Sequence, residues 1–311
     1  MTPLVSIVIP TRNRPHYLSL CLGMLKSETD NKVKICVIDD GSGEAERNLN
    51  KNICAELGVS YVRCSKNRGM AVARNIGIRH SNGNWVLFLD DDVEVKKGWY
   101  KVLKKHLKSA PDDVIGFEGK VTGTGQGLWD REVENLCGGQ FLTCHIAYRK
   151  DMLMKIGCFD ETFEYLGPFC EDHEIAVRAL REGNIIFLPD LKADHMARNV
   201  VLIRMLMNSR KRMRGIVRAE KYFFSKHPGE YKNFRNAVNF KGTYISFLVR
   251  HTLNCMRRRR FSDFLRKPGQ TIMLLFISVF EQICAWTLLP EVLLNKSVQD
   301  VPQKGKPDWS K

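Results

Sequence analysis

Short apolar runs alternate with segments of helical periodicity along the first 93 residues, and this alternation limits the fold more than any other feature. Runs rich in β-branched residues that stop at Pro, Gly or Asp are typical of buried strands. The pattern predicts an α/β fold with a doubly wound, mostly parallel sheet and right-handed crossovers. The expected strands are residues 4–9, 32–39, 59–64 and 84–93, and the expected helices are 16–27, 44–58 and 70–81.

The regular alternation loosens after this region. We expect a strand that enters a helix at 140–157, a helix with an acidic start at 170–183, and a late strand at 184–190. From residue 199 onward the pattern favours helices that are basic and apolar by turns. The chain is therefore divided into a first domain at 1–200, a basic and apolar helical extension at 201–294, and a polar tail at 295–311.

Acidic residues follow two of the expected strands. Asp39-Asp40 ends one strand and Asp90-Asp91-Asp92 ends another, and open α/β sheets bind ligands at the carboxyl ends of their strands. Three consecutive aspartates repel one another unless water or a cation neutralises them. Carboxylates with room for phosphate oxygens suit Mg²⁺ or Mn²⁺. The alternative is an acidic turn that only caps the next helix.

Two later features add candidate functional groups. Glu171 and Asp172 open an expected helix, where acids are common as capping residues, but a carboxylate held there could also act as a general base. His195 follows the late strand. It is either an ordinary polar residue, or it completes the metal site or contacts a diphosphate.

The net charge of +15 is concentrated in one part of the chain. Residues 196–269 carry 19 Lys and Arg against three Asp and Glu, whereas residues 1–195 are nearly neutral. Such a stretch predicts an anionic partner surface. Nucleic acid would require a recognised binding motif, which the sequence lacks, so we expect an anionic membrane surface and no nucleic-acid partner.

Residues 271–289 form an apolar segment whose one charged residue is Glu281. It could lie on a membrane, cross it as a single span, or pack on the protein or on a second copy in a homo-oligomer. We expect peripheral attachment at the cytosolic face. The start of the chain predicts no cleavable signal, and the ten scattered cysteines favour free thiols in a reducing compartment.

Taken together, these segments resemble the family 2 glycosyltransferases of the GT-A fold. The resemblance covers about residues 4–200 and rests on motifs that occur in the same order. They are VSIVIPTRNRPHYLSLCLGML, VIDDGS, NRGMAVARNIGI, WVLFLDDDVEV, HIAYRKDMLMKIGCFDE and EDHEIAVRALREG. The chain departs from the family at His145, where many relatives carry a polar amide.

The resemblance implies a nucleotide-sugar donor site. In it, Asp40 would hold the edge of the base, and Arg68 would contact the base or a phosphate. The first loop, with Arg14, would contact base and ribose. The residues assigned to donor binding are Pro10, Thr11, Arg14, Asp40, Arg68, Asn75, Asp90 and Asp91.

The resemblance also implies the catalytic groups. Asp92, Asp90 and His195 are assigned to a Mn²⁺ or Mg²⁺ ion, Asp172 to the catalytic base, and Glu171 to an acceptor-binding or orienting role. The implied reaction moves a sugar from a nucleotide-diphosphate sugar, preferably UDP-linked, to a saccharide or lipid-linked saccharide with inversion. The products would be cell-surface polysaccharides or glycolipids.

Two other interpretations remain open. One is a catalytically inactive relative that binds a nucleotide-sugar or a glycan, and intact acidic motifs argue against it. The other is a nucleotidyltransferase of similar fold, which would carry a Gly-rich phosphate loop after the first strand, where this chain has PTRNRP at 10–15.

Overall fold

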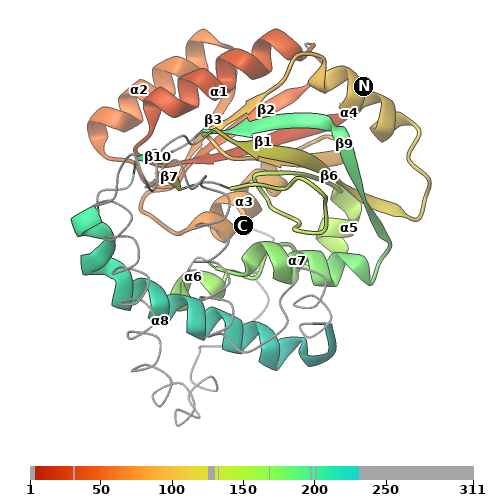
Figure 1. Cartoon of the computed structure of the whole chain (residues 1–311). Coiled ribbons are helices and arrows are strands. Elements are labelled where there is room, and N and C mark those ends of the chain that lie inside the picture. The colour runs from red at the N-terminus through yellow and green to blue at the C-terminus, as the bar shows by residue number, and fades with distance from the viewer. Residues whose placement is uncertain are drawn as a thin grey trace, which may run out of the picture.

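The computed structural model describes residues 4–30, 32–124, 130–131, 133–167, 169–196, 198–199 and 202–230. Helices cover both faces of one large sheet (Figure 1). The strands are β1 Val5–Thr11, β2 Lys34–Asp39, β3 Ser60–Arg63, β4 Trp85–Leu89, β5 Val93–Val95, β6 Val114–Gly123, β7 Asp130–Arg131, β8 His145–Arg149, β9 Asn184–His195 and β10 Arg198–Asn199. The helices are α1 Pro15–Glu28, α2 Glu44–Glu56, α3 Met70–His80, α4 Trp99–Lys108, α5 Lys150–Lys155, α6 Phe163–Leu166, α7 Glu171–Leu180 and α8 Leu202–Lys226.

The main sheet has the order β3-β2-β1-β4-β8-β6-β9-β5. Strands β3, β2, β1 and β4 run parallel, as the alternation predicted, and β6 and β9 are also parallel. Strand β8 is antiparallel to both β4 and β6, and β5 is antiparallel to β9. The predicted α/β class is thus confirmed, with a parallel first half and a mixed second half.

Alternate side chains of β1 enter two different cores. Val5, Ile7 and Ile9 pack with the buried faces of α1 and α4, whereas Val8 packs with α3, α5 and α7 on the other face. Because both faces of the strand are covered, every residue of β1 is buried. The helices hold the sheet from both sides and leave its strand ends free to carry polar groups.

Strand β9 is longer than the sequence predicted. The expected strand stopped at residue 190, near Pro189, but β9 continues to His195. The pairing with β6 shifts between Gly119, opposite Leu188, and Lys120, opposite Lys192. This irregularity accommodates the proline, which cannot donate a ladder hydrogen bond. The extension brings His195 to the end of the sheet where β4 terminates.

Helix α8 lies along α6 and α7 (Figure 1). Phe223 and Ala219 pack with Phe163 and Val177 in a small separate core. Within the described ranges, no helix combines the length and apolar composition needed to cross a bilayer. The expectations for 271–289, for 295–311 and for the extension beyond residue 230 lie outside those ranges, so the domain division stays a prediction.

Candidate active site

The turn after β4 concentrates three carboxylates at one sheet end. All five residues of β4 are buried, and the chain turns directly afterwards into β5. Asp91 is 2% exposed and Asp92 is fully buried, while the side chain of Asp90 is 21% exposed. Burying carboxylates is costly unless they are paired or coordinate a cation, so the partners of this turn define what it can do.

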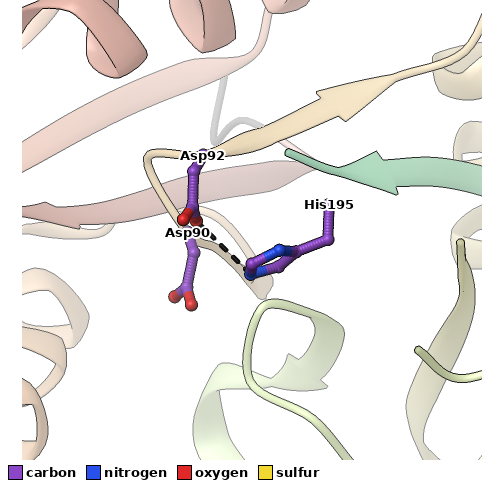
Figure 2. A group of neighbouring side chains, drawn as sticks. All are labelled: Asp90, Asp92 and His195. Carbon is purple, nitrogen blue, oxygen red and sulfur yellow. Dashed lines mark ion pairs between the residues drawn. The ribbon is translucent and has the colours of Figure 1, made fainter. Parts of the chain in front are cut away.

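Asp90, Asp92 and His195 form a candidate metal site. One ligand atom from each residue lies within 4.8 Å of the others. Figure 2 shows Asp92 and His195 facing each other, with Asp90 beside them. The pairing of β5 with β9 places His195 opposite Val93, the residue that follows Asp92 in the chain. The imidazole Nε2 of His195 consequently lies 3.5 Å from Asp92 Oδ1. Two carboxylates and one imidazole fit Mn²⁺ or Mg²⁺ with positions left for phosphate oxygens.

Asp91 points toward the first loop instead. Thr11 Oγ1 donates to Asp91 Oδ2 at 2.7 Å, and Arg14 Nη1 donates to Asp91 Oδ1 at 2.9 Å. Burial raises the pKa of Asp91 to about 6, although Arg14 and Thr11 act in the opposite direction. Asp91 therefore joins β1 to the acidic turn and is engaged away from the candidate metal group.

Arg74 links the candidate metal site to the Glu171-Asp172 pair. Its buried guanidinium lies 3.4 Å from Asp90, 3.3 Å from Glu171 and 3.4 Å from Asp172. Burial opposes its charge, but the three carboxylates together raise the pKa of Arg74 above its usual value. Arg74 is a functional residue that the sequence motif did not single out, although its neighbour Asn75 was assigned to donor binding; the available signal was a cation among the mostly apolar buried residues of α3.

The Glu171-Asp172 pair opens α7 beside this arginine. Burial and the adjacent Asp172 raise the pKa of Glu171. Asp172 is held by Thr143, whose Oγ1 donates to Oδ1 at 2.6 Å and whose amide donates to Oδ2 at 3.2 Å. With 23% of its side chain exposed, Asp172 has the accessibility that proton transfer to it from a bound hydroxyl requires.

The donor residues expected on β1 and β2 come together at the same sheet end. Asp40 follows β2, and its amide donates to the carbonyl of Thr11 at 2.9 Å. Its carboxylate accepts the amides of Arg68 at 2.7 Å and Gly69 at 2.9 Å. Burial raises the pKa of Asp40 against the effect of these bonds. Pro10 and Thr11 are buried, and Arg68 is exposed.

Asn75 lies apart from this group. Its Nδ2 donates to the carbonyl of Phe159 at 3.0 Å and to Glu161 at 3.1 Å, and its Oδ1 accepts the amide of Phe159 at 2.9 Å. The residue is 1% exposed. These contacts tie α3 to the segment after α5, so in this structure the amide has a scaffolding role.

His145, the departure from the family pattern, is also structural. Its ring is buried, and Trp99 Nε1 donates to His145 Nε2 at 2.8 Å. Burial lowers the pKa of His145 to about 4, so the imidazole is neutral at pH 7. The bond anchors the start of β8.

Glu164 was another residue that the sequence did not single out. Its Oε1 accepts the amide of Ala71 at 2.5 Å at the N-terminus of α3, where a negative charge is favoured. Burial raises the pKa of Glu164 to about 7. The structure thus brings acids at strand ends and an acidic helix start together at one end of the sheet, the arrangement that the resemblance to the family 2 glycosyltransferases led us to expect.

The comparison with known sequences supports that class. The family model for Glycosyl transferase family 2 matches residues 6–160, about half of the chain. An uncharacterized glycosyltransferase of Haemophilus influenzae is 27% identical over 198 residues, covering 58% of this chain and 63% of that protein. Chondroitin synthase of Pasteurella multocida is 26% identical over 225 residues, covering 58% of this chain and 23% of the enzyme. Glycosyltransferase GlyA of Streptococcus pneumoniae is 28% identical over 115 residues, covering 35% of this chain and 16% of that protein.

Solved structures share the fold. The mannosyltransferase PcManGT of Pyrobaculum calidifontis, in complex with GDP-Man and Mn²⁺, has a TM-score of 0.55 at 16% identity and covers 92% of this chain and 88% of its own. TarS 1-349 of S. aureus, in complex with UDP-GlcNAc, has a TM-score of 0.53 at 19% identity and covers 89% and 90%. The chain belongs to glycosyl transferase family 2 and has the GT-A fold.

Proposed function

We propose that this chain transfers a sugar from a nucleotide-diphosphate sugar, preferably UDP-linked, to a hydroxyl of a saccharide or lipid-linked saccharide, with inversion. The observation that carries the proposal is that Arg74 joins two functional groups. One is the Asp90-Asp92-His195 set and the other is the Glu171-Asp172 pair. A cation site for a diphosphate and a base for a hydroxyl are the two parts that this transfer needs.

Asp90, Asp92 and His195 are proposed to hold a Mn²⁺ or Mg²⁺ ion. A divalent ion there would offset the charge that develops on the diphosphate leaving group. Support comes from the acids gathered here: among the described residues, Arg14 forms ion pairs with Asp91 and Asp92, and Arg74 forms ion pairs with Asp90, Glu171 and Asp172. Two structural neighbours were solved with Mn²⁺, PcManGT and GalNAc-T7.

Donor binding is proposed for the loops after β1 and β2. Asp40 and Arg68 would hold the base, and the loop of Pro10, Thr11 and Arg14 would contact base and ribose. TarS was solved with UDP-GlcNAc and PcManGT with GDP-Man, so neighbours of this fold bind nucleotide-sugars. Asp90 and Asp91 complete the proposed donor set on the ribose and metal side.

Asp172 is proposed as the general base. It would take the proton of the acceptor hydroxyl as that oxygen bonds to the anomeric carbon and the bond from this carbon to the diphosphate breaks. Attack from the side opposite the leaving group gives inversion. Glu171 would orient the acceptor, and Arg74 would keep both carboxylates in place as charge moves through the site.

The test begins with a thermal-shift panel of UDP-sugars and GDP-mannose with Mn²⁺, because a bound donor stabilises the fold by mass action. UDP or GDP release then measures turnover with the best donor. Asp92→Ala should abolish turnover, and Asp172→Asn should abolish it while keeping the donor-induced shift. Asp190→Ala, an exposed acid with 82% of its side chain accessible, serves as the control.

Each failure points to a different conclusion. Full turnover in Asp92→Ala removes the metal assignment, and full turnover in Asp172→Asn removes the base assignment. A donor-induced shift with no turnover by the wild-type protein would favour the alternative function, a catalytically inactive nucleotide-sugar or glycan-binding relative. No shift with any donor rejects both functions.

The biological setting is proposed from the relatives and the charge. Chondroitin synthase and the putative glycosyltransferase EpsH of Bacillus subtilis are among the similar sequences, which supports cell-surface polysaccharide or glycolipid synthesis. The basic residues 196–269 are proposed to hold the enzyme peripherally at an anionic, cytosolic membrane face. Lys211 and Arg218 of α8 are exposed in a way that fits this. Sedimentation with anionic liposomes, lost at high salt, tests it.

A further inference from the structure

Thr143 makes the closest contacts to the proposed base. It is fully buried, and the hydroxyl and the amide of this one residue each bind a different oxygen of Asp172, at 2.6 and 3.2 Å. Because one buried residue donates a hydrogen bond to each of its two oxygens, the Asp172 carboxylate cannot rotate freely about its Cβ–Cγ bond. Thr143 therefore sets the direction in which Asp172 faces.

The contacts also distinguish the two carboxylate oxygens. Oδ1 accepts a hydrogen bond from Thr143 Oγ1 and a second one from Arg74 Nη1 at 3.4 Å. These two donors occupy both acceptor directions of Oδ1. Within the described residues, Oδ2 accepts from the Thr143 amide, and one acceptor direction is left over. Oδ2 is therefore the oxygen that can receive a proton from a bound hydroxyl.

The backbone of Thr143 is held from both sides. On the C-terminal side, the amide of His145 donates to the carbonyl of Leu142 at 3.1 Å, and Trp99 fixes the His145 ring. This closes a tight turn around residues 142–145. Thr143 thus lies two residues before His145, the first residue of β8, which pairs with Leu89, the last residue of β4, near the Asp90 turn.

On the N-terminal side, buried Glu118 of β6 organises the incoming loop. Its carboxylate accepts the amides of Gly139 at 2.7 Å, Gln140 at 3.0 Å and Phe141, and also Asn135 Nδ2 at 2.8 Å. Gly139 has a φ of 79° and Phe141 a φ of 52°, so the loop adopts a shape that the carboxylate stabilises. The position of Thr143 is consequently determined by sheet residues.

We propose that Thr143 is a positioning residue that aims Asp172 Oδ2 at the acceptor hydroxyl, with Glu118 and His145 holding the turn that presents it. This inference rests on the proposed transferase function and deepens it. In the step it serves, the acceptor O–H proton passes to Oδ2, the oxygen forms its bond to the anomeric carbon, and the carbon–oxygen bond to the nucleoside diphosphate breaks. With water as the acceptor, the products are free sugar and the nucleoside diphosphate.

The decisive experiment compares Thr143→Ser with Thr143→Ala in the full chain. Both changes remove the same methyl group, and the Ser variant alone keeps the hydroxyl. The assay follows UDP release with Mn²⁺, using the UDP-sugar that gives the largest thermal shift and water as acceptor. We expect kcat to fall about 10- to 100-fold in the Ala variant and less than about 3-fold in the Ser variant. The donor KM should stay within about twofold in both.

A control variant, Thr29→Val, removes a hydroxyl that caps α1 far from the site, where Oγ1 donates to the carbonyl of Leu25 at 2.7 Å. It should leave kcat unchanged. Equal kcat values for the Ser and Ala variants, or a loss confined to KM, overturn the positioning role while the transferase function stands. If the wild-type protein releases no nucleoside diphosphate from any donor in the panel, both proposals fall.

Discussion

Replacing Arg74 by Met probes the connection between the candidate metal site, Asp90-Asp92-His195, and the Glu171-Asp172 pair. The guanidinium lies 3.3–3.4 Å from three carboxylates and its side chain is 4% exposed. At an effective dielectric of about 20, each contact has a gross attraction of about 5 kcal/mol, most of which desolvation cancels. Removing one partner of a buried ion pair costs about 3–5 kcal/mol in net terms. We expect a loss of that size in the free energy of unfolding at pH 8.

The loss should depend on pH in a defined direction. Arg74 is one of the groups that lower the pKa of Glu171, which burial raises above its ordinary value. Without Arg74, the pKa of Glu171 in the folded protein rises further above its value in the unfolded chain. Such a group contributes stability at low pH and loses it as pH rises through its folded pKa. The deficit of the variant should therefore shrink on going from pH 8 to pH 5.

Urea unfolding of both proteins at these two pH values measures the deficit, and Arg149→Met is the matched control. Arg149 donates to the carbonyls of Val114, Ala110 and Pro111, so its loss should be nearly independent of pH. An Arg74→Met deficit below about 1 kcal/mol, or one that is equal at both pH values, would contradict the proposed stabilisation of the acidic pair by Arg74.

Three further predictions concern the scaffold. Burial raises the pKa of Glu164 from 4.5 to about 7, so its contribution to stability is lost as pH rises toward 7. Relative to Glu164→Gln, the wild-type protein should lose up to about 3 kcal/mol between pH 5 and 8 in urea unfolding. Lys226 of α8 lies 2.7 Å from buried Glu174 of α7, so Lys226→Met should cost about 1.5–3 kcal/mol. A Cβ on Gly77 would lie 2.1 Å from Val8 Cγ1, so Gly77→Ala should lower the stability by about 1–3 kcal/mol in thermal unfolding.

Much of the fold was predictable because periodicity is a local signal. The runs at β1, β2 and β4 are mostly apolar, since both faces of these strands are covered, and acids follow β2 and β4 where these strands end. The position of Asp90 and Asp92 at the end of β4 follows from this local pattern. The antiparallel insertion of β8 between β4 and β6 does not, because strand order depends on tertiary packing.

The contacts of the site were harder to predict than its acids. Arg74 meets Glu171, 97 residues further on, and no local pattern reports such a distance. Asn75 follows it in the same motif, yet one step along α3 turns its side chain toward Phe159. His195 reaches the acidic turn through an irregularity that carries β9 past Pro189. For all three residues, the course of the backbone in three dimensions determines which side chains they contact, and the residue type alone does not.

The most direct test of the central claim is Mn²⁺ binding by electron paramagnetic resonance in the presence of UDP. We predict that Asp92→Ala and His195→Ala weaken Mn²⁺ binding by at least about tenfold, whereas Asp190→Ala leaves it unchanged. Equal Mn²⁺ affinity in all four proteins, including the wild type, would contradict the assignment of the metal to Asp90, Asp92 and His195.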